Sequence, residues 1–323
     1  MDIKRIVKKG IQYLFDRNYR FLFNASKGRY KNMTDKEYIS KIYDAKLHKK
    51  MHWNNPVTFN EKLQWLKLYD HRPIYSILVD KYLVMEYVAE KIGEQYLIPL
   101  LGVWDKAEEI DFQELPNQFV LKCNHNSGTG MVICTDKNKL DYDKVISTIN
   151  VGLAQDYYQI VREWPYKNVK RKIIAEQYLI DSNVTRNSQL DSLGLIDYKF
   201  YCFNGEPHFL YIGYANIVDG KKNDYMSFRN IDWSVAEFGR DDHDPIPFQL
   251  EKPDNFEEMI DLARILAEGI PFVRVDLYSI DGNIFFSEFT LYPGSGYGIF
   301  RPEKYEQLFG TWINLDDVEK TNS

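Results

Sequence analysis

The first third of the chain carries apolar residues at helical spacing. The segment 58–61 reads Thr-Phe-Asn-Glu, which is typical of a capping box and predicts that a helix begins there. A second helix is expected over 74–92, because the apolar spacing continues to Gly93, a residue that commonly ends helices. Residues 96–104 are expected to form a loop that leads into a new unit. The pattern therefore predicts a mainly helical start.

After residue 116 the apolar residues alternate with polar ones, as they do along strands. The strands expected from this alternation are 119–123, 131–134, 172–176, 196–203, 208–214, 272–280 and 283–291. Asn204-Gly205 and Asp281-Gly282 are strong signals for tight hairpin turns. Helices are expected over 144–160 and 255–268, and a polar loop over 181–192. Helices followed by a strand-rich region with interspersed helices predict an α+β fold.

Composition narrows the class of protein. Of the 323 residues, 44% are hydrophobic and 27% charged, which excludes a disordered chain. The apolar runs are only a few residues long, short of the ~18–20 that a membrane-spanning helix needs. The three cysteines are odd in number and lack the spacing of zinc ligands. We therefore expect a cytoplasmic protein without disulfides or structural zinc.

Charge is distributed unevenly. Residues 1–50 carry 14 Lys and Arg against 5 Asp and Glu, although the whole chain has a net charge of −6. The acidic remainder argues against a nucleic-acid partner, because such binding depends on clustered cations. The basic N-terminal stretch is also amphipathic and aromatic, which suits peripheral contact with the inner face of an anionic membrane. The alternative is a capping helix that docks on the acidic body of the same protein.

A short loop and two charged strand residues are candidates for phosphate binding. Residues 127–130, Ser-Gly-Thr-Gly, lie between two predicted strands, so their backbone N–H groups can surround an anion, or they form a plain hairpin loop. Lys122 and Glu176 each interrupt an apolar strand. Such residues either meet a ligand or form a structural ion pair with each other.

The last predicted hairpin carries two acids. Arg274 and Asp276 share one face of their strand, and Glu288 lies in the very apolar partner strand. Two carboxylates on facing strands suit Mg²⁺, which prefers oxygen ligands and bridges phosphates. A two-residue turn would put Asp276 and Glu288 on opposite faces, whereas a three-residue connection or a bulge would put them on the same face. The alternative is a pair of solvent-facing acids on an edge hairpin.

A competing motif is Asp242-His243-Asp244, which matches the Asp-x-Asp pattern with which many glycosyltransferases hold a metal and a sugar nucleotide. It lies in a polar loop bounded by turn formers, where aspartates are commonly only solvated.

The ordered motifs resemble those of the ATP-grasp superfamily over roughly residues 75–315. They are Asp80-Lys81, Val120-Leu121-Lys122, Ser127-Gly128-Thr129-Gly130, Glu176-Gln177-Tyr178-Leu179, Arg274-Val275-Asp276 and Glu288-Phe289-Thr290 with Pro293-Gly294 after it. The phrases at 55–62, 119–125 and 197–200 are similar to those of the TupA-like branch, which is linked to teichuronopeptide synthesis and bacterial surface polysaccharides. The resemblance implies an ATP-grasp fold, in which two α+β subdomains clasp ATP, with a mainly helical N-terminal extension.

The resemblance also implies how ATP is held. Lys81, Lys122 and Lys199 would contact its phosphates, and the loop 127–130 would close over them. Residues 176–179 would form the hinge around the adenine, and Asp197 would face the ribose.

The implied catalytic and metal residues come from the last hairpin. Asp276 and Glu288 would bind one or two Mg²⁺ ions, and Arg274 would steady an acyl intermediate, so that Arg274 and Lys199 would be the catalytic residues. Thr290 stands where many relatives have Asn, and its hydroxyl can still ligate a hard cation.

The implied activity is that of an ATP-dependent carboxylate–amine ligase, which joins an amine donor to a glycan or sugar uronate through an acylphosphate. The alternatives are a glycosyltransferase that uses Asp242 and Asp244, a non-catalytic ATP- or glycan-binding subunit, and an ATP-grasp kinase. The expected organisation is a basic arm (1–57), a helical segment (58–116), two ATP-grasp subdomains (117–180 and 181–315, the second with the metal site) and a tail (316–323).

Overall fold

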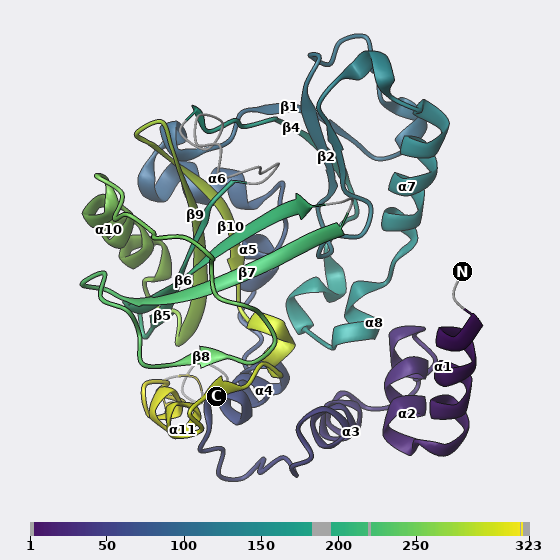
Figure 1. Cartoon of the computed structure of the whole chain (residues 1–323), viewed down its shortest axis with the longest axis vertical. Helices are drawn as coiled ribbons and strands as arrows, with labels where there is room; N and C mark the ends of the chain where they lie inside the picture. The colour runs from purple at the N-terminus through teal and green to yellow at the C-terminus, as the bar shows by residue number, and fades with distance from the viewer. Residues whose placement is uncertain (1–2, 183–194, 219–220, 317, 319–323) are drawn as a thin grey trace.

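The computed structural model describes residues 3–182, 195–218, 221–316 and 318. Two antiparallel sheets form its centre, with helices packed around them (Figure 1). Most of the loop predicted at 181–192 and of the tail predicted at 316–323 lies outside the described residues.

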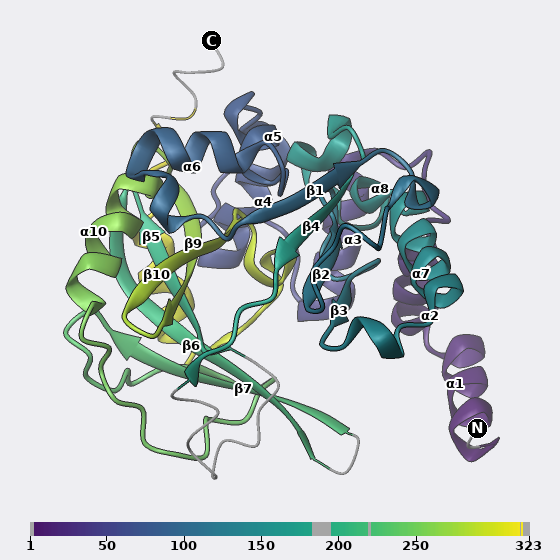
Figure 2. The ribbon, with the colours of Figure 1, turned by 90° about the horizontal axis from the view of Figure 1, so that it is seen from above.

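The first sheet has four strands in the order β1-β4-β2-β3. Their bounds are β1 Leu100–Trp104, β2 Phe119–Cys123, β3 Val132–Cys134 and β4 Ile173–Gln177. Helix α7 (Tyr142–Ala154) packs against this sheet, and the core between them contains Phe119, Leu121, Val145 and Ile149. Figure 2 shows this sheet and α7 on one side of the molecule and the second sheet on the other.

The second sheet has five strands in the order β10-β9-β5-β6-β7. Their bounds are β5 Asp197–Phe203, β6 Glu206–Val218, β7 Lys221–Asn230, β9 Phe272–Ile280 and β10 Asn283–Thr290. Phe200 meets Phe256 of helix α10 (Phe256–Ala267) on one face, with ring centroids 5.9 Å apart. Tyr201 meets Phe59 of helix α4 (Phe59–Tyr69) on the other face, at 6.4 Å. The alternation along β5 therefore places one helical layer on each side.

The remaining elements complete the helical surround. The helices are α1 Ile3–Phe15, α2 Arg17–Ser26, α3 Asp35–Leu47, α5 Ile74–Leu78, α6 Val84–Ile92, α8 Tyr157–Val161 and α11 Lys304–Thr311. A small sheet pairs β8 Gly239–Arg240 with β11 Phe300–Arg301. Single helical turns are η1 Glu94–Tyr96, η2 Ala107–Glu109, η3 Lys137–Lys139, η4 Trp164–Asn168 and η5 Pro293–Gly296.

The structure corrects two predicted helices, each of which is broken by an aspartate. The helix predicted over 74–92 divides into α5 and α6, because the Asp80 carboxylate accepts hydrogen bonds from the backbone N–H groups of Tyr82 and Leu83. The helix predicted over 144–160 divides into α7 and α8, because Asp156 caps the start of α8 by accepting from Gln159. Aspartate favours such caps over a helix interior. The capping box at Thr58 and the stop at Gly93 are confirmed.

Four strands were not predicted: β1, β7 and the two-residue strands β8 and β11. Strand β1 lies inside the expected loop 96–104 and within the segment expected to be helical, and its register is irregular between Leu100 and Gly102. A bulged edge strand lacks the regular alternation that reveals strands in a sequence. Strand β7 has a largely polar sequence without regular apolar alternation, although it pairs with the preceding strand β6 in a hairpin.

Candidate active site

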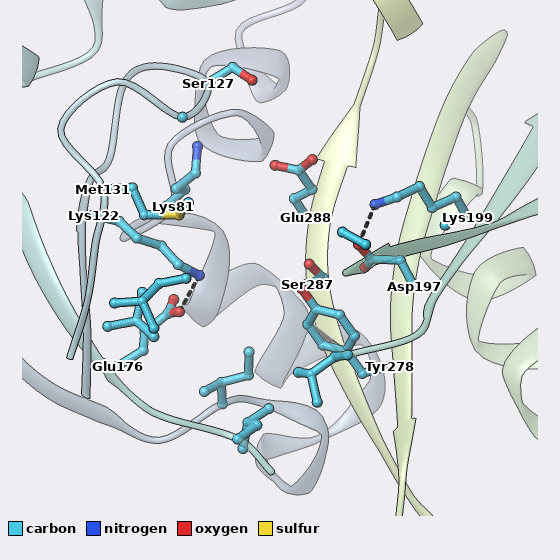
Figure 3. A pocket seen from close by; sticks show the side chains of 18 of the residues that line it. Lys81, Lys122, Ser127, Met131, Glu176, Asp197, Lys199, Tyr278, Ser287 and Glu288 are labelled. Atoms are coloured by element: carbon cyan, nitrogen blue, oxygen red, sulfur yellow. Dashed lines mark hydrogen bonds and ion pairs between the residues drawn. The ribbon is translucent and has the colours of Figure 1, made fainter. Parts of the chain in front are cut away.

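A cavity of about 510 Å³ lies between the two sheets and collects most of the predicted site residues (Figure 3). The predicted residues that line it are Lys81, Lys122, Ser127, Gly128, Thr129, Glu176, Gln177, Tyr178, Leu179, Asp197, Lys199 and Glu288. Gly130, Arg274, Asp276 and Thr290 do not line it. Gly130 supports the glycine loop, whereas Arg274, Asp276 and Thr290 lie beside Glu288 in the second sheet.

Lys122 and Glu176 point from adjacent strands of the first sheet. Val120 pairs with Glu176 across β2 and β4, so Lys122 and Glu176 are diagonal neighbours on one face. The Lys122 Nζ lies 2.5 Å from Glu176 Oε2. The structural ion pair considered for these residues is therefore present. Both side chains also line the cavity, as Figure 3 shows, so the pair presents a positive and a negative group to a ligand.

Lys81 owes its position to the break between α5 and α6. Asn124 at the end of β2 donates its side-chain amide to Asp80 at 2.9 Å, and the Lys81 Nζ donates to the carbonyl of Asn126 at 2.7 Å. Burial lowers the pKa of Lys81, and the negative charge of Glu288 opposes that shift. Lys81 is therefore held by backbone contacts on one side of the cavity, facing the acid of the other sheet.

The glycine loop 127–130 has one open end and one packed end. Gly128 has a φ of +77°, and a Cβ placed on it would meet nothing within 4 Å. Gly130 has a φ of +76°, and a Cβ there would lie 2.7 Å from the Gly152 Cα and 2.8 Å from the Cys123 Sγ. The loop is therefore anchored on α7 at Gly130 while its tip at Gly128 is unobstructed.

One end of the cavity is apolar. The side chains that form it with Tyr178 and Leu179 are Ile98, Val120, Met131, Ile133, Leu195 and Tyr278. A flat slot between apolar side chains beside backbone groups suits a purine ring. Sequence reasoning missed Ile98, which precedes β1, and Tyr278. The signal for Tyr278 was its position two residues after Asp276, on the same face of β9.

A buried charge cluster lies in the second sheet below Glu288. Lys199 and Asp276 are directly opposite across β5 and β9, and the Lys199 Nζ lies 2.6 Å from Asp276 Oδ2 and 3.2 Å from Asp197 Oδ2. Arg274 binds Asp276 with two hydrogen bonds of 2.7 and 2.6 Å. Burial opposes the ionisation of Asp276, but Arg274 and Lys199 hold its pKa below its usual range. The cluster therefore remains charged although Asp276 is fully buried.

The hairpin of β9 and β10 has a two-residue turn and a bulge. Ile280 pairs with Asn283, which alone would separate the two acids. The register shifts between Phe286 and Glu288, so Glu288 lies opposite Asp276. The bulge thus puts Asp276 and Glu288 on the same face of the hairpin, which is the arrangement that a shared metal site requires.

Of the two acids of this hairpin, Glu288 is open to a cation in the cavity, whereas both carboxylate oxygens of Asp276 accept hydrogen bonds from Arg274 or Lys199. The Glu288 side chain is 39% exposed and reaches into the cavity, with its Oε1 3.5 Å from the Arg274 Nη2, and the Thr290 hydroxyl accepts from the same Arg274 nitrogen at 2.8 Å. Within the described ranges, no group of three or more His, Cys, Asp and Glu residues could hold a metal. A site with two carboxylates suits an ion that takes its other ligands from phosphates and water. Asp276 and Glu288 remain the predicted ligands, with Thr290 beside them.

The loop after β10, which contains Ser295 and Gly296, is held in place by helix α4. Gln64 of α4 donates to the carbonyl of Gly296 at 2.7 Å, and the Lys67 Nζ donates to the carbonyl of Ser295 at 2.8 Å. Burial lowers the pKa of Lys67, which lies close to the buried Glu163. Helix α4 therefore sets the position of the segment that follows the predicted metal ligands.

One aspartate of the competing Asp-x-Asp motif, Asp242, is engaged in a salt bridge. Its carboxylate binds the Arg240 guanidinium, with Oδ1 2.9 Å from Nε, and the neighbouring Asp241 pairs with Arg301 at 3.0 Å. Arg240 and Arg301 belong to the paired strands β8 and β11. These contacts favour a structural role for Asp241 and Asp242.

Comparison with known families identifies the chain. Residues 61–314 match the family model described as TupA-like ATPgrasp. The chain belongs to the TupA-like ATP-grasp family. This confirms the resemblance and the ATP-grasp fold, and it places the protein at the superfamily level among ATP-dependent ligases.

Solved structures with a similar fold include two D-alanine–D-alanine ligases. The enzyme from Bacillus anthracis is 19% identical, with a TM-score of 0.43 over 76% of this chain and 70% of that one. The enzyme from Helicobacter pylori is 13% identical, with a TM-score of 0.42 over 79% and 69%. A RimK domain ATP-grasp protein from Sphaerobacter thermophilus is 8% identical, with a TM-score of 0.39 over 74% and 69%. Among curated proteins, no relative matches the sequence.

Proposed function

We propose that this TupA-like ATP-grasp protein is a carboxylate–amine ligase that joins an amino acid or small amine to a uronic acid of a surface polysaccharide or its precursor. The observation that carries the proposal is the grouping of Lys81, Lys122 and Lys199 with Glu288 around one cavity, above the buried Arg274 and Asp276. Cationic side chains, an acid and an apolar slot are what a site for ATP and a carboxylate requires.

The proposed reaction has two steps. An oxygen of the acceptor carboxylate bonds to the γ-phosphorus of ATP, and the bond from that phosphorus to the bridging oxygen of ADP breaks. The amine nitrogen then bonds to the acyl carbon, and the acyl carbon–oxygen bond to phosphate breaks. The products are an amide, ADP and phosphate.

The protein contributes position and charge. Lys122 faces the cavity from the first sheet, Lys81 from the loop between α5 and α6, and Lys199 from the second sheet, so they offset phosphate charge from several sides. Bound Mg²⁺, which Asp276 and Glu288 would hold with Thr290 beside them, supplies further neutralisation of the transferring group. Arg274 is kept charged by Asp276 and lies beside Glu288, where a developing negative charge on the acyl group needs a partner.

Water must be kept from an acylphosphate, because water hydrolyses it. The glycine loop is suited to this task, since its tip at Gly128 is unobstructed while Gly130 is anchored on α7. The three cysteines are free and buried, in keeping with a reaction in the cytoplasm.

The test is a screen for ADP release with uronic-acid acceptors combined with amino acids and small amines, with products read by mass spectrometry. The proposal predicts ADP release that needs both partners, and a product whose mass is the sum of the two less one water. A product heavier by a phosphoryl group would indicate a kinase, and a product formed from a sugar nucleotide would indicate a glycosyltransferase. ATP binding without turnover on any pair would indicate a binding subunit.

A further inference from the structure

Three large apolar side chains are exposed together on the first N-terminal helix. Ile11, Leu14 and Phe15 of α1 have 54%, 66% and 84% of their surface exposed. Ile11 lies one turn before Leu14 and Phe15, so the three side chains share a helix face. We call these three residues the apolar patch. Folding does not bury them, so they are available to something outside the chain.

The patch belongs to a rigid pair of helices. Arg20 of α2 donates to the carbonyl of Leu14 at 2.9 Å, which caps the end of α1. Tyr13 contacts Phe23 edge-on, with ring centroids 5.4 Å apart, and its hydroxyl donates to Asn24 at 3.2 Å. The two helices therefore hold the patch in one fixed arrangement.

The helix pair is attached to the body through α3. Asp35 accepts a salt bridge from Arg162 at 3.0 Å, and the Tyr38 hydroxyl donates to the carbonyl of Ile160 at 2.7 Å. Both partners lie in or beside α8. Figures 1 and 2 show α1 at the outer edge of the molecule, beyond α2 and α3. The exposed patch therefore argues against the alternative of a helix that covers the acidic body.

The amino-acid sequence of the helix that carries the patch is basic. The sequence of α1 contains four Lys and Arg residues and no acid. Asp16, between the helices, has its carboxylate engaged in capping α2, where it accepts from the backbone of Tyr19 at 2.9 Å. Lys27 lies over the Phe23 ring, 5.9 Å from its centroid. Apolar and aromatic side chains flanked by cations are the pattern of a surface that lies on anionic lipid.

We propose that the apolar patch docks the protein on an anionic membrane surface. A second copy of the chain is a poorer occupant, because the three side chains expose only roughly 400 Å² at about 200 Å² for each residue type. A stable dimer buries about 800 Å² on each partner. The family match begins at residue 61, so α1, α2 and α3 lie outside the matched domain. Within the described residues, no helix has both the length and the apolar character to cross a bilayer, so the contact would be peripheral.

The first test is co-sedimentation of the full chain with vesicles. The vesicles are phosphatidylcholine alone, or phosphatidylcholine with one third phosphatidylglycerol. We expect binding to the anionic vesicles that weakens in high salt, and at least a tenfold loss of affinity in the variant I11S/L14S/F15S. The matched control V235S/I265S/L308S removes three exposed apolar side chains elsewhere, and we expect wild-type binding from it. Both variants should keep wild-type ATP binding.

A second test reads the depth of insertion. Because all three native cysteines are buried, a cysteine placed at Phe15 can be labelled selectively with a polarity-sensitive fluorophore. We expect its emission to shift to shorter wavelength with anionic vesicles, while the same label at Val235 does not respond. Equal binding by the patch variant and its control would overturn the proposal. So would binding of equal strength to vesicles with and without phosphatidylglycerol. A dimer in sedimentation velocity that the patch variant dissociates, without vesicle binding, would assign the patch to a second copy instead.

Discussion

Two glycines of the loop 127–130 share a backbone conformation but differ in their surroundings, which allows a matched experiment. Gly128 and Gly130 both have φ near +77°, where an L side chain is strained. Only Gly130 also packs against backbone, because an added Cβ would lie 2.7 Å from the Gly152 Cα. Gly152 is the reciprocal case, since its added Cβ would lie 2.6 Å from the Gly130 Cα and it has no positive φ.

The expected costs follow from these two contributions. The left-handed conformation costs an alanine about 1–2 kcal/mol, which is the whole expected loss for Gly128→Ala. Overpacking against a backbone that cannot move aside costs about 1–3 kcal/mol more, so Gly130→Ala should lose about 2–5 kcal/mol. Gly152→Ala carries the overpacking cost, reduced by about 0.5–1 kcal/mol because alanine is the better helix residue.

The measurement is thermal unfolding of the three variants in parallel, together with their affinity for Mg·ATP. Gly128→Ala should unfold only a few degrees below the wild-type temperature, in keeping with a loss of about 1–2 kcal/mol. Gly130→Ala should unfold lowest, and the double variant of Gly130 and Gly152 should lose less than the sum, because both substitutions fill one space. The reasoning would be refuted by a Gly130→Ala variant as stable as Gly128→Ala, or by Gly152→Ala raising stability as at an ordinary helical site.

Three further predictions concern charged residues. Lys122→Ala should lower Mg·ATP affinity by at least ~10-fold in calorimetry with circular dichroism unchanged, since one phosphate partner is lost; unchanged affinity would remove Lys122 from the site. Burial raises the pKa of Glu306 to about 7, so the folded state holds this proton more tightly and stability falls as pH rises from about 4.5 to 7. Glu306→Gln should therefore be more stable than wild type at pH 8, by up to about 3 kcal/mol in urea unfolding. A stability difference between the two proteins that is the same at pH 4.5 and at pH 8 would contradict this. Glu288→Gln should lower ligase turnover by more than ~100-fold and Asp242→Asn by less than ~2-fold; the reverse pattern would favour the glycosyltransferase.

Local signals in the sequence predicted much of the fold. The turn at Asp281-Gly282 and the capping box at Thr58 depend on neighbouring residues only, and both form as expected. The breaks at Asp80 and Asp156 also have local causes, but helical periodicity outweighed the capping preference of aspartate in the interpretation. Those breaks matter, because the first one places Lys81 in a loop at the cavity.

The details of the site depend on tertiary packing and could not be predicted in the same way. The bulge before Glu288 has no sequence signature of its own, yet it decides which face carries the acid. The burial of Asp276 with Arg274 and Lys199 results from the pairing of β5 with β9, which are far apart in the sequence. The ordered motifs identified the family because their residue types and order can be seen in the sequence itself. The apolar part of the cavity at Ile98 and Tyr278, in contrast, is formed only when the two sheets come together.

The proposed acylphosphate can be detected by following oxygen. The ligase would be incubated with Mg·ATP, an amine and a uronic acid whose carboxylate is labelled with ¹⁸O, and the released phosphate would be analysed by mass spectrometry. The proposed reaction predicts that each phosphate carries one oxygen from the carboxylate, because that oxygen bonds to the γ-phosphorus before the amide forms. Amide formation with unlabelled phosphate, or with release of AMP and pyrophosphate, would contradict it.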